Sequence, residues 1–115
     1  MTETKGDSVV TAKEKIEEMV RRIVAKCNPD RIILFGSHAR GTGDPESDAD
    51  LLVVMEPKGS RRQQATEIDV ALWGVSLPAD VIVVTPEDVE RNRNQLGTII
   101  HSALREGKVV YERPS

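Results

Sequence analysis

The sequence predicts an α/β fold of the α+β kind: one domain in which helices flank a small mixed β-sheet. Three observations predict it. Short apolar runs typical of buried strands occur at residues 31–35, 49–55, 80–85 and 109–112. Segments with helical apolar spacing precede, separate or follow these runs. The 115 residues suit a single domain that can bury a core of its own.

The predicted helices begin at recognisable caps. Residues 11–14 have the spacing of a capping box, and the apolar positions after it repeat at helical intervals. A second box at residues 60–63 opens a helix that runs to about residue 75. Thr85 can cap a helix that begins with proline, and an apolar stripe continues to Gly107.

Residues 1–10 mix polar and charged side chains without apolar periodicity. We therefore expect them to form a flexible N-terminus, and residues 11–115 to form the folded domain. No internal repeat and no low-complexity tract divides that domain further.

Two aspartates open the second predicted strand. Asp48 and Asp50 lie on either side of Ala49, and a fully apolar run follows Asp50 directly. Side chains two apart on a strand leave the same face about 6.6 Å apart, so both carboxylates can converge on a pair of metal ions. Paired magnesium ions clamp the attacking and leaving oxygens of a phosphoryl displacement and prefer carboxylate and phosphate ligands. The alternative is a surface turn, where acidic residues are common.

Gly36 and Ser37 follow the first predicted strand directly. Glycine would let the backbone approach phosphate groups, and the serine hydroxyl and nearby amides would donate to phosphate oxygens. In isolation the pair is an ordinary turn, but next to Asp48 and Asp50 it favours a nucleoside triphosphate site. Asp80 opens the third predicted strand as Asp48 opens the second, and is the best candidate for a third carboxylate; its alternative is a strand-start turn residue. Asp69 and Glu67 are rivals that fall on the intervening helix.

These positions also predict strand directions. Gly36 ends the first strand and Asp48 begins the second, so they meet only if the two strands are antiparallel. Asp80 joins them if the third strand is parallel to the second. Parallel neighbours need a crossover of a dozen or more residues, which residues 56–79 supply.

The stretch from Gly36 to Gly41, followed by residues 47–51, resembles the signature of the DNA polymerase beta nucleotidyltransferase superfamily. More narrowly, the chain looks like a minimal nucleotidyltransferase, and the order of elements extends the resemblance over about residues 12–112. The resemblance implies transfer of AMP from ATP with two Mg²⁺ ions. Asp48, Asp50 and Asp80 would hold the metals, Asp80 would help to deprotonate the acceptor, and Gly36, Ser37 and Arg40 would bind the nucleotide.

Minimal nucleotidyltransferases of this kind are commonly partnered with a small all-helical HEPN ribonuclease, as the antitoxin of a toxin–antitoxin pair. The resemblance therefore implies a protein acceptor, a tyrosine of the toxin that receives AMP. Two other functions stay open. One is a nucleotide-binding antitoxin that sequesters its partner without transfer, and the other is a nucleotidyltransferase with a small-molecule acceptor. Apolar faces leave room for an oligomer.

Composition narrows the partners. The formal net charge is −3 and basic residues are not clustered, which argues against direct nucleic-acid binding. One cysteine, Cys27, and no signal peptide or long apolar run predict a cytoplasmic protein without membrane spans.

The remaining side chains of interest have plainer interpretations. Trp73, Cys27 and Tyr111 are expected to pack in the interior. His38 is expected to face solvent, and its distance in the chain from His101 gives little support to a histidine metal pair. Arg61 and Arg62 are expected to form a solvated helix face, with contact to the nucleotide or a partner as the alternative.

Overall fold

The computed structural model describes residues 11–41 and 47–114. The predicted flexible N-terminus lies outside the described residues. The elements in chain order are α2 (Ala12–Cys27), β1 (Arg31–Phe35), α3 (Ser37–Arg40), β2 (Ala49–Val54), α4 (Arg61–Ala71), β3 (Ala79–Val84), α5 (Pro86–Asn92), α6 (Ile99–Glu106) and β4 (Lys108–Glu112).

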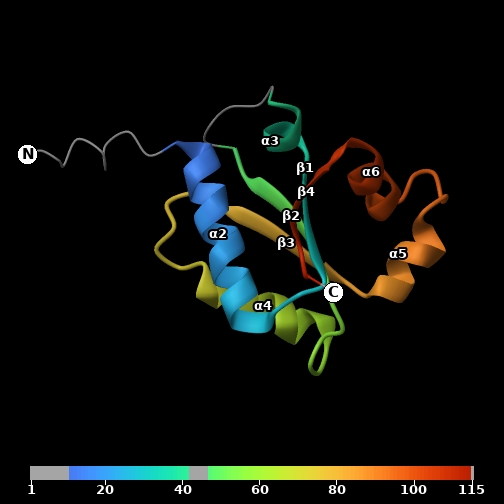
Figure 1. Ribbon diagram of the computed structural model, residues 1–115, viewed down its shortest axis with the longest axis horizontal. Helices are drawn as coiled ribbons and strands as arrows, with labels where there is room; N and C mark the ends of the chain where they lie inside the picture. Colours follow the sequence, from blue (N-terminus) through green and yellow to red (C-terminus); the bar gives the residue numbers. More distant parts are fainter. Residues whose placement is uncertain (1–10, 42–46, 115) are drawn as a thin grey trace, which may run out of the picture.

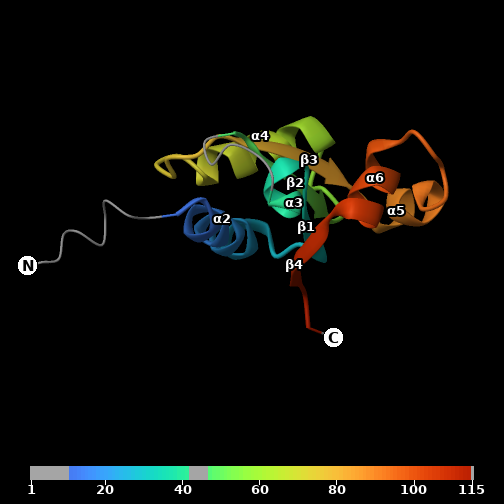
Figure 2. The same ribbon diagram turned by 90° about the horizontal axis from the view of Figure 1, so that it is seen from above.

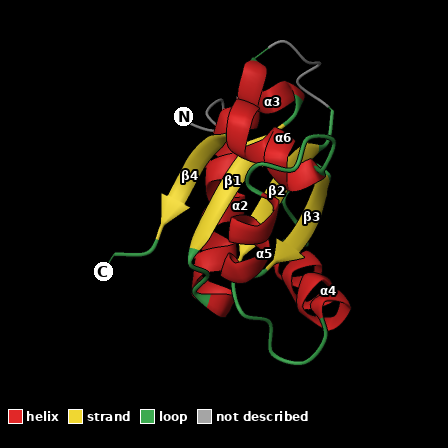
Figure 3. Ribbon diagram, turned by 90° about the vertical axis from the view of Figure 1, so that its right-hand side faces the viewer, coloured by secondary structure: helices red, strands yellow, loops and turns green. Residues whose placement is uncertain are grey.

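The four strands form one mixed sheet in the order β3-β2-β1-β4. β1 is antiparallel to both β2 and β4, and β2 is parallel to β3. The predicted strand directions are therefore confirmed, and α4 lies in the crossover between β2 and β3. Figure 3 shows the strands side by side, with the short helix α3 at their upper end.

Helices cover both faces of the sheet. Figures 1 and 2 show α2 and α4 on one side of the strands and α5 and α6 on the other. Alternate strand residues supply the two cores: Leu51 and Val53 pack with α2 and α4, while Leu52 and Val54 pack with α5 and α6. Both faces are buried, which explains why β2 is a continuous apolar run.

Local capping fixes where the helices begin. Thr11 accepts a hydrogen bond from the Glu14 amide, Ser60 accepts one from Gln63, and both predicted capping boxes are complete. The helix after Ser60 ends at Ala71, about four residues before the predicted end, because a turn follows in which Gly74 has a φ of +94°.

The segment after Thr85 forms two helices. α5 ends at Asn92, and a turn containing Gly97, with φ of +88°, separates it from α6. Thr98 caps α6 by accepting a hydrogen bond from the His101 amide. Within the described residues, no helix combines the length and the apolar character needed to cross a bilayer.

Candidate active site at the carboxylate end of the sheet

One end of the sheet gathers the predicted site residues; we call it the carboxylate end. There β1 finishes at Phe35, and β2 and β3 begin. Asp50 is the register partner of Asp80 across the parallel β2–β3 pair and of Phe35 across β1. Backbones of neighbouring strands lie about 4.8 Å apart, so the fold brings Asp50 and Asp80 together from residues 30 positions apart in sequence.

Gly36 lies against the carboxylate of Asp50. A β-carbon built on Gly36 would overlap Asp50 Oδ2, and the backbone φ of +76° is one that residues with side chains seldom adopt. Gly36 therefore has two independent reasons to be glycine. Its backbone turns sharply out of β1 into α3 while it leaves space for the Asp50 side chain.

The charges at the carboxylate end repel one another. Burial raises the pKa of Asp50, and the Asp80 and Asp48 carboxylates raise it further, in that order. His38 acts weakly in the opposite direction. Asp48 and Asp80 are exposed, whereas Asp50 is half-buried. A bound cation would offset this repulsion, and structural ion pairing does not: no ion pair joins these aspartates to another described residue.

The turn after β1 is tied to the start of β2. Ser37 Oγ lies 3.1 Å from Ser47 Oγ, and His38 Nε2 donates to the Ser47 carbonyl at 2.6 Å. His38 was expected to face solvent; it is instead half-buried, because this hydrogen bond holds it against the chain that leads into Asp48. The two contacts fix the Gly36–Ser37 turn relative to the aspartates.

Arg40, the predicted phosphate ligand at the end of α3, is exposed. Its Nη1 lies 3.7 Å from Glu106 Oε1 of α6. Exposed ion pairs at such distances contribute little to stability, so this contact leaves the guanidinium available to another anion. The assignment of Arg40 to phosphate remains a prediction.

Asp69 lies closer to the site than its place in a helix suggested. Burial raises its pKa first, and the Asp80 carboxylate raises it further, so the two carboxyl groups interact. No sequence signal marks this approach, since Asp69 lies near the end of α4 and its position depends on how the crossover packs. Knowledge of the α4–β3 packing would have been needed to find it.

Among the described residues, no three histidine, cysteine, aspartate or glutamate side chains are already arranged as a metal-binding group. The donor set nevertheless suits magnesium. Asp50 and Asp80 are paired by register, Asp48 precedes β2 by one residue, and all three offer hard oxygen ligands. A metal that also takes phosphate oxygens would complete its coordination from the substrate.

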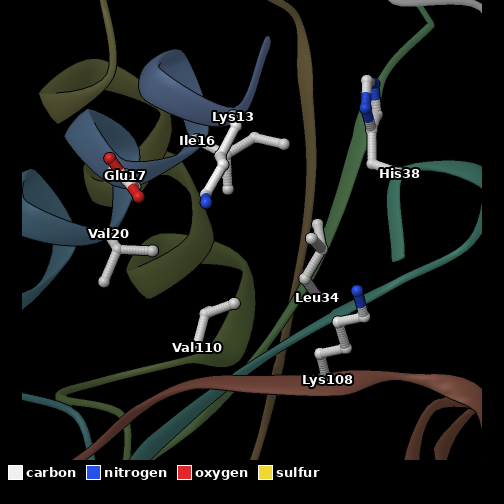
Figure 4. A pocket seen from close by; sticks show the side chains of 8 residues that line it. All are labelled: Lys13, Ile16, Glu17, Val20, Leu34, His38, Lys108 and Val110. Carbon is white, nitrogen blue, oxygen red and sulfur yellow. The ribbon is translucent and has the colours of Figure 1, made fainter. Parts of the chain in front are cut away.

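A cavity of about 550 Å³ opens on the α2 side of the sheet. Figure 4 shows α2 side chains facing residues of β1, α3 and β4 across it. Its lining is Lys13, Ile16, Glu17, Val20, Leu34, His38, Lys108 and Val110. His38 links this cavity to the turn at the carboxylate end, but none of the three predicted metal ligands lines it.

Of the three residues predicted to pack in the interior, two do so and one does not. Cys27 and Tyr111 are partly buried and pack against the core beneath α2 and α4, as expected. Trp73 does not, since 74% of its surface is exposed. Leu72 and Leu77 on either side of it are buried instead, so the short loop turns the tryptophan outward. Arg61 is exposed but pairs with Asp88 at 2.8 Å.

Comparison with known proteins decides the family. A family model described as a nucleotidyltransferase domain matches residues 13–110, which is most of the chain. The chain belongs to the nucleotidyltransferase domain family. The prediction that this protein is a nucleotidyltransferase enzyme is confirmed, as is the predicted fold class.

Two relatives come from Methanocaldococcus jannaschii, and each bears the name "putative protein adenylyltransferase". One is 31% identical over 107 residues, which cover 85% of this chain and 70% of the relative. The other is 36% identical over 72 residues, which cover 61% of this chain and 72% of the relative. Both place this nucleotidyltransferase domain with proteins named for adenylyl transfer to protein.

Two solved structures share the fold. A protein described as a putative nucleotidyltransferase from Sulfolobus solfataricus superposes with a TM-score of 0.61 at 19% identity, over 98% of this chain and 91% of that one. A structure described as a toxin–antitoxin with AMP-PNP gives a TM-score of 0.52 at 22% identity, over 87% of this chain and 73% of that one. At these identities the likeness concerns the fold.

Proposed function

We propose that this nucleotidyltransferase transfers AMP from ATP to a hydroxyl group of a partner protein. We further propose that it is the antitoxin of a toxin–antitoxin pair, and that the acceptor is a tyrosine of an all-helical HEPN ribonuclease toxin. The names of the two archaeal relatives support a protein acceptor. The toxin–antitoxin neighbour with AMP-PNP supports the choice of an adenine nucleotide and of this biological setting.

The observation that carries the proposal is the pairing of Asp50 with Asp80 beside Gly36. Strand register brings the two carboxylates together, and Gly36 leaves space for one of them. Because burial and then these like charges raise the pKa of Asp50, its ionised form costs stability unless it binds a cation. Asp48, Asp50 and Asp80 would hold two Mg²⁺ ions, which when bound supply positive charge to the phosphates and a lower pKa to the acceptor hydroxyl.

The residues of the chain have separable roles in this reaction. The Gly36 backbone lets the triphosphate approach, and the Ser37 hydroxyl and the Arg40 guanidinium donate to its oxygens. Asp80 faces the acceptor and takes up its hydroxyl proton. The acceptor oxygen bonds to the α-phosphorus, the bond from that phosphorus to the bridging oxygen breaks, and pyrophosphate leaves.

The test uses ATP labelled at the α or the γ phosphate, with Mg²⁺, in lysate of the native cells. The expected result is a protein band that carries the α label and lacks the γ label. The band is expected to disappear with an Asp48→Asn, Asp50→Asn double variant and with EDTA. Glu90→Gln is the matched control, because it removes an exposed carboxylate of α5 that pairs with Arg93.

The mass of the labelled band identifies the acceptor. Label retained in the double variant would contradict the catalytic role of these aspartates. A wild-type protein that binds ATP, labels nothing and still neutralises its partner would instead be a sequestering antitoxin. Label found only in small molecules would point to a small-molecule acceptor.

A further inference from the structure

Trp73 is the most unusual exposed side chain near the carboxylate end. It is the single tryptophan of the chain, and 74% of its surface is in contact with solvent. Val70, one helical turn earlier on α4, is also exposed. Tryptophan is among the residues that most often carry binding energy at protein interfaces, so a solvated one next to an active site calls for a partner.

The loop that presents Trp73 is held in place from α2. Arg22 Nη1 donates to the Trp73 carbonyl at 2.6 Å and to the Ala71 carbonyl at 3.3 Å, while Arg22 Nε is fixed by Glu18 at 2.9 Å. Lys15 Nζ donates to the Ser76 carbonyl at 3.2 Å. Hydrogen bonds therefore hold the backbone on both sides of Trp73 in place. This lowers the conformational entropy that the loop would lose when the Trp73 side chain binds a partner.

This loop lines an open cavity of about 500 Å³ that reaches Ala79, the first residue of β3. Its lining is Asp69, Leu72, Trp73, Gly74, Val75, Leu77, Pro78 and Ala79. Ala79 directly precedes Asp80, and the Asp69 carboxyl interacts with that of Asp80. The cavity is lined by both polar and apolar atoms, has one acidic side chain, and reaches the residue before Asp80.

The charge around the cavity specifies the occupant. Asp69, which lines the cavity, and Asp80, which follows Ala79 of its lining, are both exposed, and neither pairs with a cation from another described residue. A basic side chain of a docked segment would satisfy the Asp69 carboxylate, which lines the cavity and is not one of the proposed metal ligands. A second copy of this chain is a poor occupant, because a two-fold contact through Trp73 would bring the same acidic groups of both copies together.

We propose that the Trp73 surface, defined as Asp69, Val70, Trp73 and the cavity that Asp69 and Trp73 line, is where the acceptor protein docks. The docked segment is basic, places an apolar side chain against Trp73, and presents its hydroxyl beside Asp80. This inference rests on the proposed function, since it takes the partner to be the acceptor of AMP. It adds the place of docking and the charge of the segment.

Because Trp73 is the single tryptophan, its fluorescence reports docking directly. The probe is a short synthetic peptide with one tyrosine, one leucine and flanking arginines, and its counterpart has glutamates in place of the arginines. We expect the basic peptide to shift the indole emission to the blue in a saturable way that salt weakens, and the acidic peptide to have no effect. Asp69→Lys is expected to weaken binding of the basic peptide.

The outcomes that overturn docking are distinct. An emission that shifts with neither peptide, or equally with both, refutes a basic docked segment. A blue shift that appears when the protein alone is concentrated, with sedimentation showing a dimer, assigns the surface to a second copy instead.

Transfer of the α label to the basic peptide gives the second readout. Trp73→Ala is expected to raise the KM for the peptide about tenfold with little change in kcat, and to leave the affinity for Mg²⁺ and AMP-PNP unchanged. Leu96→Ala is the matched control, because Leu96 is 80% exposed in the turn between α5 and α6. Its KM is expected to equal that of the wild type.

The two proposals fail separately. Peptide that binds at Trp73 but never receives label, with no labelled protein in the lysate, leaves the docking surface standing and refutes transfer. Peptide that receives label with the same KM in Trp73→Ala and wild type leaves transfer standing and refutes the docking surface.

Discussion

Asp50 and Asp88 lie near opposite ends of the sheet and have opposite surroundings. Asp50 is half-buried among like charges, and burial together with Asp80 and Asp48 raises its pKa. Asp88, whose side chain is only 9% exposed, accepts a hydrogen bond from the Thr85 amide at 3.0 Å. Thr85 and the guanidinium groups of Arg61 and Arg91 lower its pKa.

The difference separates a carboxylate that we propose to bind metal from one that stabilises the fold. Asp88 closes a capping box at the start of α5, and its pairing with Arg61 connects α5 to the start of α4, so its charge is satisfied within the fold. The charge of Asp50 is not satisfied within the fold, and a bound ligand would have to satisfy it. An aspartate whose surroundings oppose its ionisation, at the mouth of an apolar strand, therefore marks the site.

The largest expected effect concerns Asp88. Asp88→Ala should lower the free energy of unfolding by about 3 kcal/mol, because it removes a helix cap together with the hydrogen-bonded ion pairs to Arg61 and Arg91. Urea denaturation measures the change. Glu90→Ala, which affects only an exposed pair with Arg93 on the same helix, should change stability by less than about 0.5 kcal/mol. Equal effects of the two variants would refute the contrast.

The next effect concerns the carboxylate end. Gly36→Ala should reduce transfer at least about a hundredfold, because the new methyl group displaces the Asp50 carboxylate and a small misplacement of catalytic groups is costly. Gly41→Ala is the control: Gly41 has a similar φ of +72°, but a β-carbon there meets nothing within 4 Å. Both variants share the backbone strain, so a comparable loss of transfer in Gly41→Ala would assign the effect to strain alone.

The pH dependence of stability should follow Asp88. Its folded-state pKa is lowered, so its contribution is present above the unfolded pKa of about 4 and is lost as the pH falls through the folded value. Asp88→Asn should therefore cost about 2 kcal/mol near neutral pH, and that cost should shrink in acid. Urea denaturation of both proteins across this pH range measures the difference. A cost that stays constant down to strongly acid pH would contradict the assignment.

The smallest expected effect has the opposite sign. Asp50→Asn should raise the free energy of unfolding by about 0.5 kcal/mol in the absence of divalent metal, since it removes the repulsion with Asp80 and Asp48. Thermal denaturation with and without Mg²⁺ checks the cause. Magnesium should raise the melting temperature of the wild type and not that of Asp50→Asn. A destabilised Asp50→Asn protein would show that the carboxylate serves the fold.

The sequence by itself determined most of the helices and strands, and it predicted the residues of the carboxylate end. Capping boxes, strand alternation and glycine's freedom at a turn act over a few neighbouring residues, so they could be recognised without a structure. The relative directions of the first three strands also followed, because Gly36, Asp48 and Asp80 meet only if these strands run as they do in the structure. The place of β4 beside β1 was not predicted. The family match agrees with that chemistry.

The tertiary structure decided what depends on packing between distant segments. Trp73 was expected inside and lies outside, because Leu72 and Leu77 fill the space beneath the loop. Asp69 approaches Asp80, and Arg61 pairs with Asp88, because α4 packs beside β3 and begins near α5. Hydrophobicity and charge tell which side chains can be buried or paired. The side chains that are in fact buried or paired depend on how the whole chain packs, because the interior volume is limited and side chains compete for it.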